Sequence, residues 1–126
     1  MQSALSAIEK FSIKKKGQNV MLKCNIIEWT VNVLRNAAAL KEYTLDYVTA
    51  LLMNLVLRTE GKRKCEEPDV DILDVLKPLM EHPNTQIRSH INGTLYSLFT
   101  TEAIKEKAKV KAFKVIIVEY GIFHNS

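Results

Sequence analysis

Apolar residues recur at three- and four-residue spacing through most of this chain, which is the pattern of helices that bury one face. The segment 43–58 is apolar almost all round, so we expect it to be buried between neighbouring helices. The spacing predicts short, medium and long helices in succession, over residues 2–11, 20–24, 26–36, 43–58, 61–65, 68–81, 86–99, 101–109 and 112–120.

Turn and capping residues set the expected helix boundaries. The Lys14–Gly17 stretch interrupts the apolar pattern and predicts a turn. Asn25 is a candidate N-cap for the helix after it, and Gly61 is expected to end the longest helix. Pro68 suits the first turn of the next helix, where its missing N–H costs nothing. Pro78 is expected to bend or end that helix.

A helical motif occurs twice. Ala50–Leu55 returns as Gly93–Leu98, with leucines and small residues in register, and residues 3–8 carry a weaker copy upstream. This interval matches the ~40–47-residue period of armadillo and HEAT arrays, and three helices per repeat favour the armadillo type. We therefore predict an all-α, right-handed armadillo-type superhelical solenoid. It would contain about two full repeats (18–59 and 61–99) and partial repeats at both ends (1–12 and 101–126).

The last expected helix is ambiguous by local propensity. Val115–Val118 is β-branched and would form a strand on propensity alone, but the repeat register favours a helix. Its apolar residues would leave an exposed apolar end face. We therefore expect either a longer native chain or a partner docked on this end, over Val115, Ile116, Ile117, Ile122 and Phe123.

Composition narrows the class of protein. The chain has 126 residues and a net charge of +4, which permits acidic partners without requiring them. No apolar run reaches the ~18 residues of a membrane span, and no secretory signal is visible. With only Cys24 and Cys65, a disulfide framework is not expected and an intracellular site is favoured.

No motif for chemistry emerges. Histidines and cysteines are scattered singly, so we expect no metal and no cofactor. Gly61–Lys64 lacks the full pattern of a phosphate-binding loop. The carboxylates near 66–71 are explained by a helix start, which favours negative charge. We therefore expect a non-enzymatic protein that presents a binding surface, as solenoids do.

Two surfaces are candidates for partner binding. The first is a groove along the repeated long helices, whose core faces are expected to hold Leu45, Val48, Leu52 and Leu55 in one copy and Arg88, Ile91, Leu95 and Leu98 in the other. Polar residues offset from those faces would line the groove. Asn54 stands out because a lone amide in so apolar a helix needs a hydrogen-bond partner. The expected groove residues are Tyr47, Asn54, Arg58, His90 and Ser97; packing between repeats is the alternative.

The second surface is a basic corner after the longest helix. Lys62, Arg63 and Lys64, together with Arg58, could meet an acidic partner, and a solvated loop is the alternative. Lys14–Lys16 is a weaker basic run, for which nuclear import is a minor alternative to solvation. No nucleic-acid partner is expected.

The residues also resemble a known family. Tyr47–Cys65 and Ile91–Leu98, with Ile27–Trp29 and Val33–Leu34, resemble the armadillo repeat-containing protein 9 family of LisH-domain proteins. The resemblance covers residues 26–98. It implies a non-enzymatic scaffold for protein–protein interactions in cytoplasm and cytoskeleton, at the basal body, centriole and ciliary axoneme or tip. Its implied role is in cilium assembly and stability. In such an assembly the basic corner could meet tubulin or another ciliary or basal-body protein. The alternative is a generic helical-repeat adaptor with partners unrelated to cilia.

Nuclear-import armadillo proteins pair a tryptophan with an asparagine one turn apart on the third helix. Here Ala50 precedes Asn54, and Trp29 lies on a second helix. Cargo binding of the import type is therefore not expected.

Overall fold

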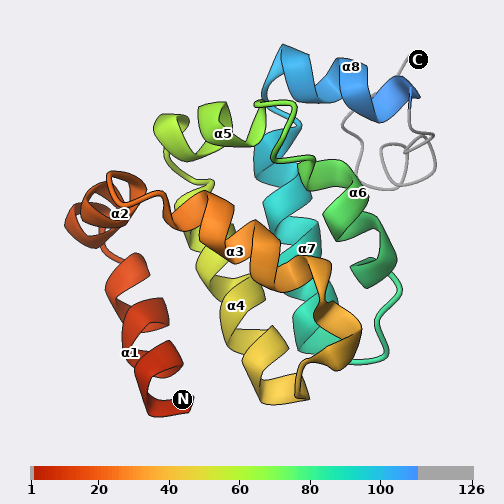
Figure 1. Cartoon of the computed structure of the whole chain (residues 1–126). Coiled ribbons are helices and arrows are strands. Elements are labelled where there is room, and N and C mark those ends of the chain that lie inside the picture. The colour runs from red at the N-terminus through yellow and green to blue at the C-terminus, as the bar shows by residue number, and fades with distance from the viewer. Residues whose placement is uncertain (1, 111–126) are drawn as a thin grey trace.

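The computed structural model describes residues 2–110, and every regular element within that range is helical. Figure 1 shows two layers of helices and a row of short helices along one edge. The elements are α1 (Gln2–Ser12), α2 (Lys15–Leu22), α3 (Ile26–Arg35), η1 (Ala37–Ala39), α4 (Glu42–Leu55), α5 (Thr59–Cys65), α6 (Ile72–Leu76), η2 (Lys77–Leu79), α7 (Thr85–Leu98) and α8 (Glu102–Val110).

The long helices form the inner layer. α4 lies between α1 and α7 and packs against both, and α3 and α6 pack together as the second layer (Figure 1). The short helices α2 and α5 directly follow the C-terminal ends of α1 and α4. A set of three successive helices therefore occurs in α2–α4 (8, 10 and 14 residues) and again in α5–α7 (7, 5 and 14 residues), where the 3₁₀ turn η2 extends the middle helix. Three helices per repeat are the arrangement of an armadillo-type solenoid.

The core lies between the two layers and follows the predicted apolar faces. Leu45, Val48, Leu52 and Leu55 of α4 are all at most 3% exposed. Three buried threonines, Thr30, Thr49 and Thr94, satisfy their hydroxyl groups by donating to carbonyl oxygens one turn earlier. One member of the predicted core face is wrong. Arg88 is only partly buried and its guanidinium donates to the carbonyl oxygens of residues 82 and 83, whereas Ile87 is fully buried.

Both glycine boundaries are corrected by the structure. Residues 15–17 are not a turn but the first turn of α2, and Gly61 lies inside α5 instead of ending α4, which stops at Leu55. A Cβ at Gly17 would lie 2.0 Å from the carbonyl oxygen of Phe11, and one at Gly61 would lie 2.2 Å from that of Leu55. These glycines let each short helix fold back against the end of the preceding long helix.

Two other helix starts differ from expectation. Asn25 does precede α3, but it takes a left-handed conformation (φ 56°) and its side chain caps nothing. Pro68 lies in a loop, and α6 begins only after the left-handed Asp71. Arg35 holds this loop, because its Nη2 donates to the carbonyl oxygens of Val70 (2.6 Å) and Asp69 (3.3 Å). A backbone held from outside in this way does not continue as a helix.

Other boundary predictions are confirmed. The α-helix before Pro78 ends at Leu76 and continues only as the 3₁₀ turn η2. α7 begins at Thr85, one residue before the expected start, and Asn84, which was not among the expected caps, accepts from the backbone N–H groups of residues 86 and 87. The expected helix 112–120 and the apolar end face lie outside the described residues. The repeat boundaries stay predictions, although the short helices begin at Lys15 and Thr59.

Candidate partner-binding surfaces

Two of the groove residues predicted from sequence, Asn54 and Tyr47, make contacts within the chain. Asn54 finds its hydrogen-bond partner inside the chain, because its Nδ2 donates to Ser12 Oγ at 2.9 Å. This bond joins the last turns of α4 and α1. Tyr47 is half-buried and packs against the hydrophobic core. Both residues therefore contribute to packing between long helices, which is the alternative raised above.

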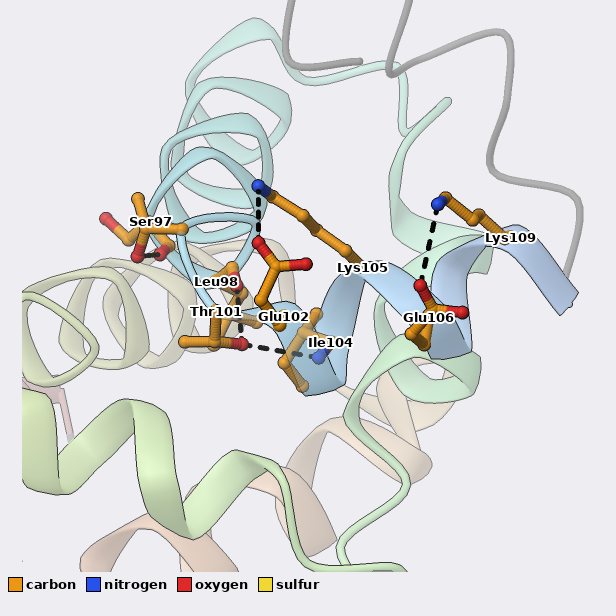
Figure 2. A network of polar contacts seen from close by, with 9 residues as sticks. Ser97, Leu98, Thr101, Glu102, Ile104, Lys105, Glu106 and Lys109 are labelled. Carbon is orange, nitrogen blue, oxygen red and sulfur yellow. Dashed lines mark hydrogen bonds and ion pairs between the residues drawn. The ribbon is translucent and has the colours of Figure 1, made fainter. Parts of the chain in front are cut away.

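Ser97 and its neighbours serve the turn between α7 and α8. Ser97 is 9% exposed, and its carbonyl oxygen accepts from Thr100 Oγ1 at 2.7 Å. The hydroxyl of Thr101 caps α8 by accepting from the backbone N–H of Ile104 at 3.3 Å (Figure 2). The lysines Lys105 and Lys109 pair within α8 with Glu102 and Glu106 (Figure 2). The Thr101 hydroxyl thus caps the start of α8, and the two ion pairs lie along the helix.

His90 lies at the seam between α7 and α4. Its Nδ1 is 3.0 Å from Thr49 Oγ1 and 3.4 Å from Asp46 Oδ1. The Thr49 hydroxyl already donates to the Asp46 carbonyl oxygen at 3.0 Å, so we assign the proton of the ring to Nδ1. Asp46 Oδ1 is buried and has no hydrogen-bond partner among the described residues, so it contributes by charge. Sequence reasoning missed Asp46, although an acid in so apolar a helix was a usable signal.

Burial lowers the pKa of His90 from its ordinary value of 6.5, and the carboxylates of Asp46 and Glu9 oppose this shift. The unfolded chain therefore binds more protons than the folded chain at mildly acidic pH. The stabilisation from neutral His90 is fully present above pH 6.5 and is lost as the pH falls through the lower, folded-state pKa.

We expect the free energy of unfolding to decrease between pH 7.5 and pH 5, and the variant His90→Gln to lose part of that decrease. Glutamine keeps hydrogen-bonding capacity but does not titrate. Urea unfolding at several pH values measures the effect, and an NMR titration of the ring reports its pKa. Equal pH dependence in the two proteins would contradict the assignment.

An open groove lies beside this seam. It has a volume of about 640 Å³ and is lined by Met53 of α4 and by Asn84, Thr85, Gln86, Ser89 and His90. Gly93 leaves room for the side chain of Met53, because a Cβ at this position would lie 2.7 Å from the sulfur of Met53. Amides, hydroxyls and an imidazole are groups that hydrogen-bond a polypeptide and carry no acid–base or nucleophilic arrangement. Only His90 of the predicted groove residues lines this groove.

The basic corner is partly neutralised within the chain. Lys64 Nζ lies 3.3 Å from Glu28 and 3.3 Å from Glu67, and hydrogen bonds to these two carboxylates raise the pKa of Lys64. Lys62 and Arg63 form no ion pair with any described residue, and Arg58 occupies the N-cap position of α5. The cations of the corner without an ion pair among the described residues are therefore Lys62, Arg63 and the partly buried Arg58.

Residues 2–110 contain neither an activated cysteine nor a metal-binding cluster. Cys24 and Cys65 are free thiols, and burial raises the pKa of Cys65 to about 12, so it is not a nucleophile at neutral pH. The described part of the chain has no cluster of His, Cys, Asp or Glu that could hold a metal ion. None of its helices is both long enough and apolar enough to cross a membrane.

The chain is similar to known proteins over most of its length. A family model described as "LisH domain-containing protein ARMC9, ARM repeats" matches residues 21–122. The LisH domain-containing protein ARMC9 of Danio rerio is 39% identical over 120 residues, which are 95% of this chain and 15% of that protein. The Homo sapiens protein of the same name is 38% identical over 116 residues, covering 92% of this chain and 14% of its own.

The chain thus spans about 15% of the length of the Danio rerio relative that it matches. No solved structure matches it.

Proposed function

The chain belongs to the LisH domain-containing protein ARMC9 family, within its armadillo repeats, and from this premise we propose that it binds protein partners at the basal body and ciliary axoneme. The armadillo-type solenoid is a repeat scaffold and carries no catalytic arrangement among the described residues. The ciliary role, in cilium assembly and stability, comes from the family resemblance. Tubulin and other basal-body proteins are the partners that we propose.

One observation supports protein binding. The long helices α1, α4 and α7 lie side by side, and at the α4–α7 seam they leave an open groove of about 640 Å³. Its polar side chains can hydrogen-bond the backbone of an extended peptide, and Met53 offers an apolar, adaptable contact. Solenoids commonly use such extended surfaces for binding.

The localisation part of the proposal is tested in ciliated cells with the tagged full-length protein. We expect the protein at basal bodies and along the axoneme. Its absence from both would remove the ciliary role and favour the alternative, a helical-repeat adaptor with partners unrelated to cilia.

The groove is tested in the same cells by proximity labelling. Ser89→Arg places a long charged side chain in the groove from an exposed position on α7, so we expect the loss of a subset of labelled partners. The matched control is Asn36→Arg, at an exposed position after α3 in the other layer. An identical partner set for wild type and Ser89→Arg would show that partners bind elsewhere.

A further inference from the structure

The short helices α2 and α5 carry a shared set of basic side chains on one edge of the solenoid. Their positions correspond: Lys14 is the N-cap residue of α2 (φ −86°, ψ 140°) and Arg58 is that of α5 (φ −89°, ψ 144°). The Asn54–Ser12 hydrogen bond ties together the ends of the two long helices from which α2 and α5 depart. We name this surface the basic edge; it comprises Lys14, Lys15, Lys16, Arg58, Lys62 and Arg63.

The charges of the basic edge have no role in holding the described fold together. No Asp or Glu occurs in residues 10–27, and α2 has no acidic residue in its first turn. Lysines at a helix N-terminus oppose the helix dipole, so Lys14–Lys16 destabilise α2 slightly. None of the basic-edge side chains forms an ion pair with a described residue, and Arg58 Nε is buried without a hydrogen-bond partner there.

Exposed apolar side chains accompany the charges in register. Ile13 is 61% exposed and precedes Lys14, and Leu57 is 58% exposed and precedes Arg58. A ligand that bridges the two helices would therefore meet a cation and an exposed aliphatic side chain at each of them.

Charge and shape favour one class of ligand. A membrane-surface helix needs a broad free apolar face, but α2 buries Gly17 and Met21 and leaves only Val20 strongly exposed, and α5 buries Gly61 and Cys65. Single-stranded nucleic acid needs a series of stacking platforms, whereas the side chains in register with the cations here are aliphatic. The exposed Phe11 has no aromatic counterpart before α5, where the buried Leu55 takes the matching position. An acidic polypeptide with interspersed apolar residues complements both the charges and the exposed aliphatic groups.

We propose that the basic edge binds a single extended acidic segment of a partner protein, with interspersed apolar residues, across α2 and α5. The inference rests on the proposed protein-binding function and names the chemistry of one partner. The basic edge contains the basic corner without Lys64, which is neutralised within the chain, and adds the lysines at the start of α2.

The test uses fluorescence anisotropy on the full chain, with a labelled peptide of several Glu-Glu-Leu units and a short peptide of one unit. We expect the long peptide to bind and the short one to bind far more weakly. The variants Lys15→Glu/Lys16→Glu and Lys62→Glu/Arg63→Glu are each expected to weaken binding of the long peptide by about 5–10-fold. Combining the two pairs is expected to abolish it.

The control Lys41→Glu/Lys77→Glu makes the same change of net charge away from the edge and is expected to alter affinity by less than about twofold. Glutamates in the first turn of α2 suit the helix dipole, so Lys15→Glu/Lys16→Glu is expected to be at least as stable as wild type. Lost binding then cannot come from unfolding. Glutamine replacements at the same positions give a second, milder series.

The proposal is overturned by unchanged affinity in both edge variants, or by an equal loss in the control. Tighter binding to anionic phospholipid vesicles or to an oligo-dT strand than to the long peptide also overturns it. These outcomes leave the localisation and Ser89→Arg experiments unaffected, so failure of the edge and failure of the ciliary proposal are distinguishable.

Discussion

Replacing Gly61 by alanine is expected to lower the free energy of unfolding by about 2–3 kcal/mol, although alanine is the better helix former. The added Cβ would lie 2.2 Å from the carbonyl oxygen of Leu55 and 3.0 Å from its carbonyl carbon. Both atoms belong to backbone, so no side-chain rotation relieves the clash. α5 must move away from the end of α4, which loosens the packing of the buried Cys65.

Gly93→Ala is the matched control. Its Cβ would meet Met53 at 2.7 Å, but the contact is with the end of a flexible thioether side chain. We expect this variant to be neutral, or more stable by up to about 1 kcal/mol from helix propensity. Urea unfolding followed by circular dichroism compares the two. Equal stability of Gly61→Ala and wild type would mean that α5 does not approach α4 as closely as described.

Leu52→Ala is expected to cost about 3–4 kcal/mol, because it opens a cavity in the centre of the core. Leu52 is fully buried in α4, which packs against α1, α3 and α7, so its neighbours cannot readily close the space. The same unfolding measurement gives the loss, and reduced cooperativity of the transition is expected if the repeats separate.

Leu57→Ala removes the same atoms from a side chain that is 58% exposed and is the natural control. We expect its cost to stay below about 1 kcal/mol. A similar loss in the two variants would show that Leu52 is not at the centre of the core.

Much of the fold could be predicted from side-chain period alone. The repeated motif correctly placed α4 and α7, since a leucine that returns at three- and four-residue spacing reports a buried face in any helical packing. Leu52 and Leu95 are both buried, as expected. The period failed at Arg88, because a polar residue can occupy the register of a core position when a neighbour such as Ile87 fills the core instead.

The candidate sites were less predictable. Asn54 was correctly expected to need a hydrogen-bond partner, but only packing of α4 on α1 brings Ser12 to it. His90 was placed on the same helix face without its neighbours, since Thr49 and Asp46 are distant in sequence. Lys64 counted as a free charge until folding put Glu28 of α3 beside it. Contacts between helices have no local signature in the sequence.

By itself, the sequence determined the helical class, the repeat, the family and most buried leucines, because each follows from the order of residue types along one chain segment. Only the tertiary structure decided what Gly17 and Gly61 do. By local propensity a glycine predicts a turn or a helix end. Here the missing Cβ of each glycine lets the backbone of the preceding long helix approach closely. The same folding gives Lys14 and Arg58 equivalent places, as the N-cap residues of α2 and α5. This correspondence is the basis of the proposed basic edge, and it follows from the turn that each long helix makes into a short one.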